Sequence, residues 1–265
     1  MSSFLQRSLS GLVYVVLFIG SVLYSKESFV TLTAVFGLIC IREFSKLIKS
    51  KAYVSYAIFI AIIVFIALRE DSFQGILIGL VLALTGSLQS LYFLFSKKAK
   101  TPKNSVLKED LTIRYLVLSF GLLILLPFSE GNYEPLIIVY LLLLIWSNDS
   151  FAYLIGKNFG KRKLYESVSP KKTIEGFVGG VVFTVITGVV ISYYSELFSM
   201  IHWIVLSLLA SILGTIGDLV ESKFKRQANI KDSGSIMPGH GGMLDRLDSL
   251  FFVAPFVYLY IHFII

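Results

Sequence analysis

The sequence has few of the residues that stabilise a water-soluble domain. Only 15% of its 265 residues are charged, whereas 55% are hydrophobic and 14% are aromatic, and this balance is too apolar for a soluble domain of this length. The single cysteine, Cys40, excludes an intramolecular disulfide and a thiolate metal cluster. Lipid is therefore the expected solvent for most of the chain.

Familiar nucleotide and zinc motifs are also absent. The chain has neither a GxxxxGK(S/T) phosphate loop nor an HExxH zinc motif. Its net charge of +7 would suit nucleic acid, but the basic residues are divided among separate loops and form no single patch. We therefore expect no nucleic acid partner, and any nucleotide site has to be argued from carboxylates and lysines.

What the sequence has instead is a series of long apolar stretches. A spanning helix needs roughly 20 mostly apolar residues, and this criterion predicts an all-α, polytopic integral membrane protein with about nine transmembrane helices. The predicted spans are Leu5–Tyr24, Phe29–Leu47, Tyr53–Leu68, Phe73–Phe95, Leu111–Phe128, Pro135–Gly156, Ile174–Tyr194, His202–Leu219 and Ser249–Ile265.

The basic residues orient these spans. If the N-terminus is cytoplasmic, 22 of the 24 Lys and Arg residues fall on the cytoplasmic side, and only Lys26 and Arg69 fall on the other. Because cytoplasmic loops accumulate Lys and Arg, we predict a cytoplasmic N-terminus and, with an odd number of spans, a C-terminus on the opposite side.

Acidic residues lie at the ends of the last two predicted spans. Asp218 lies where the eighth span meets the cytoplasm, with Glu221 and Ser222 on the same helix face, and Asp245 and Asp248 begin the ninth. Ionisable groups at such positions are costly unless they are paired or bind a cation. Their oxygens suit Mg²⁺ or Mn²⁺ better than Zn²⁺. The alternative is a set of interfacial acids that neighbouring basic residues neutralise.

Glycines and basic side chains accompany these acids. Gly241 and Gly242 leave backbone N–H groups open to a phosphate, while His240 is expected either to serve phosphate chemistry or to have a structural role. The basic residues that supply countercharge are Lys223, Lys225, Arg226 and Lys231. This combination predicts phosphoryl or nucleotidyl transfer. Asn148 and Asp149, deep in the sixth span, are expected to face the bundle interior beside the site.

These residues resemble a known family. The series Ser222-x-Phe224-Lys225-Arg226, Lys231-Asp232, Gly234, Pro238-x-His240-Gly241-Gly242 and Asp245-Arg246-Leu247-Asp248 resembles the signature of phosphatidate cytidylyltransferases, also called CDP-diacylglycerol synthases. Upstream, Asn148-Asp149 and Ser169-Pro170-Lys171-Lys172-Thr173 resemble the same family. The resemblance covers roughly Trp146 to Asp248.

The resemblance implies a reaction and assigns roles. CTP and phosphatidic acid would give CDP-diacylglycerol and pyrophosphate with a divalent metal, Mg²⁺ or Mn²⁺, and a second cation is left open. Asp218, Asp245 and Asp248 would hold the metal, with Glu221 beside them. The catalytic assignment also includes His240 and Lys225. Substrate and phosphate contacts are assigned to Lys171, Lys172, Lys223, Arg226, Lys231, Arg246, Ser222, Gly241, Gly242, Asn148 and Asp149.

The expected organisation follows from these assignments. Residues 1–110 would form N-terminal spans with a basic cytoplasmic loop, and residues 111–265 would form the catalytic membrane region. We expect an integral protein of a bacterial inner membrane, in contact with membrane lipid, with its site facing the cytoplasm; a homodimer is left open. Two alternatives remain: a CTP-dependent polyprenol-type lipid kinase, and a cation transporter in which Asp149 and Asp218 bind the permeating ion.

Overall fold

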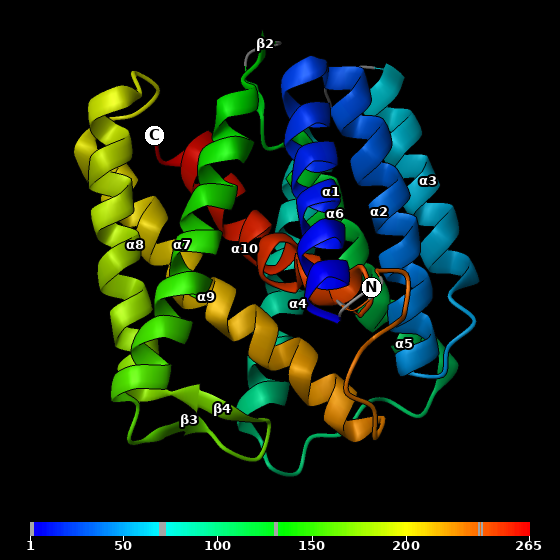
Figure 1. Cartoon of the computed structure of the whole chain (residues 1–265). Coiled ribbons are helices and arrows are strands. Elements are labelled where there is room, and N and C mark those ends of the chain that lie inside the picture. Colours follow the sequence, from blue (N-terminus) through cyan, green and yellow to red (C-terminus); the bar gives the residue numbers. More distant parts are fainter. Residues whose placement is uncertain (1–2, 69–72, 130–131, 238, 240) are drawn as a thin grey trace.

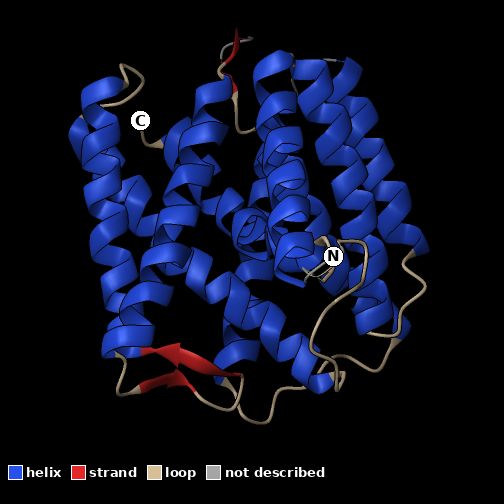
Figure 2. Cartoon of the chain, viewed as in Figure 1, coloured by secondary structure: helices blue, strands red, loops and turns tan. Residues whose placement is uncertain are grey.

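The computed structural model describes residues 3–68, 73–129, 132–237, 239 and 241–265, with side chains from Leu9 onward. Helices dominate the described part, and the strands form two short hairpins (Figures 1 and 2). The helices are α1 Ser3–Tyr24, α2 Lys26–Leu47, α3 Tyr53–Leu68, α4 Phe73–Phe95, α5 Ser105–Thr112, the π-helical η1 Ile113–Val117, α6 Leu118–Leu125, α7 Pro135–Phe159, α8 Ile174–Tyr194, α9 Met200–Gln227 and α10 Leu244–Phe263. The strands are β1 Phe128–Ser129, β2 Asn132–Tyr133, β3 Lys163–Tyr165 and β4 Ser169–Thr173.

Each predicted span has a helical counterpart. The bounds of α3, α4 and α8 are those predicted, and the fifth span corresponds to the succession of α5, η1 and α6. Among the described residues, α2, α4, α7, α8 and α9 are long and apolar enough to cross a membrane, and α3 and the Leu9–Tyr24 part of α1 are shorter apolar helices. The prediction of an all-α integral membrane protein is confirmed, while the count of nine and the sides of the termini stay predictions.

The largest departure from the prediction lies between the last two spans. We expected a loop from Glu221 to Asp248, but α9 continues to Gln227 and α10 begins at Leu244. The connecting segment, residues 228–243, is called the α9–α10 loop below. The hydropathy criterion placed the end of the eighth span at Leu219, which is too early. The polar residues of the next helical turns are buried against other helices rather than exposed to water.

Close contacts between helices depend on glycines. A Cβ on Gly176 of α8 would lie 2.6 Å from the carbonyl oxygen of Ala152 of α7, and one on Gly217 of α9 would lie 2.9 Å from the carbonyl oxygen of Asp248 of α10. Small residues at such positions let helix backbones approach closely. In Figure 1, α9 and α10 run obliquely through the centre of the molecule while α7 and α8 stand beside them. The polar residues that begin at Asn148 on α7 and those that begin at Asp218 on α9 are thereby brought together.

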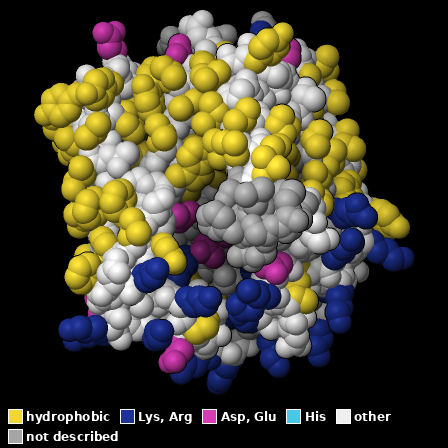
Figure 3. All heavy atoms as spheres, in the orientation of Figure 1, with side chains coloured by type: hydrophobic (Ala, Val, Ile, Leu, Met, Phe, Trp, Pro, Cys, Tyr) yellow, Lys and Arg dark blue, Asp and Glu magenta, His cyan; other side chains and the backbone are white. Residues whose placement is uncertain are grey.

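The segment between α7 and α8 is a hairpin rather than the predicted loop. Strands β3 and β4 pair antiparallel, with Lys163 opposite Thr173 and Tyr165 opposite Ser169. The side chain of Thr173 then caps α8 by accepting a hydrogen bond from the N–H of Gly176 at 3.1 Å. Figure 3 shows lysines and arginines gathered at this end of the molecule, below a largely apolar band.

Candidate active site

A cavity of about 700 Å³ opens between α7, α8, α9, α10 and the β3–β4 hairpin. Figure 3 shows acidic side chains within a hollow of the molecule's face, next to the basic end. Most of the predicted site residues line the cavity: Asn148, Asp149, Lys171, Lys172, Asp218, Ser222, Lys225, Arg226, Lys231, Asp245, Arg246 and Asp248. The structure therefore joins the two polar segments that the sequence places 70 residues apart, from Asn148 to Asp218.

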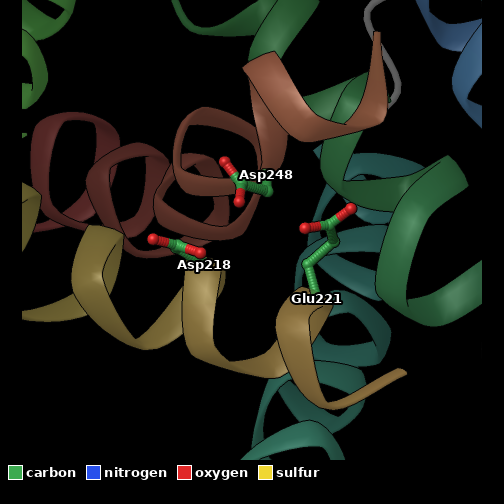
Figure 4. A group of neighbouring side chains, drawn as sticks. All are labelled: Asp218, Glu221 and Asp248. Carbon is green, nitrogen blue, oxygen red and sulfur yellow. The ribbon is translucent and has the colours of Figure 1, made fainter. Parts of the chain in front are cut away.

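Three carboxylates form the centre of the site. Asp218 and Glu221 lie one turn apart on α9, and Asp248 faces them from α10 (Figure 4). One oxygen of each lies within 4.8 Å of the others. Glu221 is fully buried, and Asp248 is 8% exposed. Acids that converge in this way, two of them buried and Asp218 partly exposed, fit a hard divalent cation, whose preferred ligands are oxygens.

Two lysines lie against the acidic cluster. Lys172 of β4 forms an ion pair with Asp218. The Nζ atom of Lys225 lies 2.5 Å from an oxygen of Glu221 and 2.5 Å from an oxygen of Asp245. Basic neighbours therefore neutralise some of these acids, as the alternative interpretation expected. Lys172 thus pairs with one acid of the convergent group, and Lys225 pairs with a second acid of that group and with Asp245.

The charges of the cluster also shift pKa values at its edge. Burial opposes protonation of Lys172, but the Asp218 carboxylate outweighs burial and raises the pKa of this lysine above its usual value. Burial would raise the pKa of Asp245, ahead of the predicted ninth span, but Lys225 and the N–H groups of Gly242 and Ser233 lower it. Lys172 is thus held as a cation and Asp245 as an anion.

Asp245 holds the α9–α10 loop. Its Oδ2 accepts hydrogen bonds from the N–H of Ser233 at 2.9 Å, the hydroxyl of Ser233 at 2.9 Å and the N–H of Gly242 at 2.8 Å. Its Oδ1 is engaged by Lys225. Both oxygens are thus used in the fold, and Asp245 does not belong to the convergent group of Asp218, Glu221 and Asp248. Asp245 still lines the cavity, and its assignment as a metal ligand stays a prediction.

The predicted phosphate-binding glycines serve the same loop. Gly241 has a φ of +91°, a conformation that favours glycine, and its N–H bonds to the carbonyl of Met237 at 3.1 Å. The N–H of Gly242 donates to Asp245. The prediction of open N–H groups at these two residues is wrong, because the loop uses both internally. His240, a predicted catalytic residue, lies outside the described residues.

Lys223 also departs from the prediction. Its Nζ donates to the carbonyls of Phe93, Leu94 at 3.1 Å and Ser96 at 2.9 Å, at the C-terminal end of α4. It also lies 4.8 Å from the ring centroid of Phe93. Last-turn carbonyls attract cations, so Lys223 stabilises a helix end and does not line the cavity.

Other predicted residues line the cavity, and their roles there stay predictions. Ser222 donates to Asp218 at 3.2 Å, and Arg226 donates to the carbonyl of Val168 at 3.2 Å while still lining the cavity. Asn148 donates to Thr215 at 3.2 Å, and its buried Oδ1 has no hydrogen-bond partner among the described residues. Several other polar residues line the cavity without having been assigned a role from the sequence, among them Lys157, Lys163, Thr215 and Ser249.

The different positions of two lysines give a matched test. We expect Lys172→Ala to raise the KM for an anionic nucleotide about tenfold or more while changing the unfolding midpoint little, since a charge-assisted contact is worth about 1.5–3 kcal/mol. Lys223→Ala removes a buried helix-end contact, and should lower the unfolding midpoint and leave KM nearly unchanged. Steady-state kinetics and thermal unfolding in detergent measure both. The same pattern of effects in both variants would contradict the assignment.

Comparisons with known proteins agree with this geometry. The chain is 48% identical over 122 residues to a phosphatidate cytidylyltransferase of Bacillus subtilis (strain 168), covering 46% of this chain and 45% of that protein. It is 50% identical over 129 residues to one from Staphylococcus aureus (strain COL), covering 48% of each. The chain thus spans about half the length of the curated relatives it matches. A family model described as the cytidylyltransferase family matches residues 5–264. Because this match runs along nearly the whole chain and includes every wall of the cavity, the protein belongs to the cytidylyltransferase family.

Proposed function

We propose that the protein transfers the cytidylyl group of CTP to phosphatidic acid, releasing pyrophosphate and giving CDP-diacylglycerol. The observation that carries this proposal is the cavity where Asp218 and Asp248, two of the three convergent carboxylates, meet a rim of lysines and arginines. The names of the similar bacterial proteins support the choice of substrates.

The residues that line the cavity can bind the phosphates that take part in this reaction. Lys171, Arg226 and Lys231 line it as cations for the phosphates of CTP. A phosphate oxygen of phosphatidic acid attacks the α-phosphorus of CTP, and the bond from that phosphorus to the oxygen of the leaving pyrophosphate breaks. The attacking oxygen is already ionised near neutral pH, so the reaction depends on positioning and charge more than on a protein base.

The acidic cluster is the proposed metal site. Asp218, Glu221 and Asp248 would hold Mg²⁺ or Mn²⁺ because their oxygens converge and Glu221 is buried with an oxygen that has no hydrogen-bond partner among the described residues. A cation bound there would neutralise charge on the transferring phosphoryl group and on pyrophosphate. Lys225 then holds Glu221 and Asp245 in place.

We place the site at the cytoplasmic face of a bacterial inner membrane. The cavity opens at the end of the molecule where lysines and arginines gather, and such residues favour the cytoplasmic side. CTP reaches the protein from the cytosol, and the headgroup of phosphatidic acid lies at the same interface. A cation transporter would instead need polar groups along a path through the apolar band.

The products decide between transferase and kinase. With CTP labelled in the cytidine, purified protein and phosphatidic acid should give a cytidine-bearing lipid and unlabelled pyrophosphate, and EDTA should stop the reaction until Mg²⁺ is restored. Thin-layer chromatography and a pyrophosphate assay measure both. In a parallel reaction that supplies a polyprenol, release of CDP with a newly phosphorylated polyprenol would contradict the proposal and support the lipid kinase.

A further inference from the structure

A buried acid from an N-terminal helix contacts the site's loop. Glu43 of α2 is 4% exposed. Its Oε2 accepts a hydrogen bond from the N–H of Leu244, the first residue of α10, at 2.8 Å, and one from the hydroxyl of Ser233 at 3.3 Å. The second predicted span therefore contacts the α9–α10 loop directly.

Glu43 and Asp245 hold the same loop. The Ser233 hydroxyl lies within hydrogen-bond distance of both carboxylates, at 3.3 Å from Glu43 and 2.9 Å from Asp245. Glu43 also packs on the loop's glycines: a Cβ on Gly242 would lie 2.6 Å from its Oε2. A side chain at that position would displace the carboxylate, so these glycines make room for Glu43.

The contacts continue from Glu43 into the acidic cluster. Asp245, which shares Ser233 with Glu43, engages Lys225 at 2.5 Å, and Lys225 engages Glu221 at 2.5 Å. Lys231 and Asp232, just before Ser233, line the cavity. A movement of the loop would therefore displace two lining residues and disturb the hydrogen bonds that hold Asp245 of α10, a partner of Lys225.

We propose that Glu43 is a positioning residue of the active site: it anchors the α9–α10 loop so that Asp245 and Lys231 keep their places at the cavity. The N-terminal helices are then part of the catalytic structure. The carboxylate works as a hydrogen-bond acceptor, because its described contacts are with an N–H and a hydroxyl. The activity readout rests on the proposed function, whereas the loop's hydrogen exchange does not.

Hydrogen exchange of the full-length protein in detergent tests the anchoring. Glu43→Ala should speed exchange in peptides covering residues 228–244 at least tenfold, whereas Glu43→Gln, whose amide oxygen accepts the same bonds, should stay within threefold of the wild type. Glu109→Ala is the matched control, since Glu109 accepts from the N–H of Ser55 at 3.1 Å, away from the loop. It should leave exchange of this loop unchanged.

Turnover and a double variant complete the test. Glu43→Ala should lower kcat at least tenfold, with kcat preserved in Glu43→Gln and Glu109→Ala. Ser233→Ala should also speed loop exchange, and adding it to Glu43→Ala should have less than an additive effect, because the two residues share one contact. Wild-type exchange in both single variants, or equal loop exchange in Glu109→Ala and Glu43→Ala, would overturn the proposal. If the wild type itself transfers no cytidylyl group, the proposed function fails and hydrogen exchange still decides the role of Glu43.

Discussion

Asp248→Asn is expected to lower CTP turnover by about 100-fold or more, since removing one electrostatic group from a preorganised site costs about 10²–10³ in kcat. Asp248 lines the cavity and belongs to the convergent carboxylates. Asparagine keeps its size and an oxygen that accepts from the N–H of Ser249, a contact of 2.7 Å in the wild type. The change therefore removes charge with little change in packing.

The measurement compares this variant with Asp110→Asn. Asp110 of α5 pairs with Arg114 of η1 and does not line the cavity. Its variant should keep wild-type turnover, and both variants should unfold within a few degrees of the wild type in detergent. Turnover of Asp248→Asn above a tenth of the wild-type value would remove this carboxylate from the proposed metal site.

Lys225→Met is expected to cost about 3–5 kcal/mol of stability and to abolish measurable turnover, because breaking a buried ion pair leaves an uncompensated charge. Lys225 is 8% exposed and engages both Glu221 and Asp245. Methionine fills a similar volume, so loss of charge rather than a cavity is the main effect. Denaturant titration in detergent measures the stability.

A second substitution separates charge from packing. Glu221→Gln removes one of the unpaired acids left in Lys225→Met, so the double variant should regain part of the lost stability without regaining activity. Divalent cation should also stabilise the wild type more than the double variant, since Glu221 is in the convergent group. If Lys225→Met is as stable as the wild type, the two ion pairs contribute nothing to the fold.

The sequence predicted the helices and the two groups of polar residues, but it did not predict which side chains of these groups contact one another. Residue spacing places Asp218 and Glu221 on one helix face, yet it cannot say how α10 turns toward them. Asp248 lies with Asp218 and Glu221, while Asp245, three residues earlier, bonds to the α9–α10 loop. Lys223 was misplaced for the same reason, because its partners are carbonyls of α4, more than 120 residues away.

Glu43 carried a signal that the prediction left unused. It is an acid within the predicted Phe29–Leu47 span, and ionisable groups in apolar spans usually mark functional positions. What the sequence could not supply was its partner, since the contacts with Ser233 and Leu244 join residues about 200 positions apart. The pattern of hydropathy identifies such a residue but does not locate the loop that it binds.

The hairpin before α8 links the site to the bilayer. Lys172 lies in β4, one residue before the cap of α8, and its partner Asp218 belongs to α9. Most of α8 is unburied within the molecule, so the surrounding hydrocarbon contributes to setting its tilt. A thicker or thinner bilayer that changes this tilt would move Lys172 relative to Asp218. If the protein catalyses the proposed reaction, the acyl chains around it would then act on the rate at which CDP-diacylglycerol, a precursor of membrane phospholipids, is made.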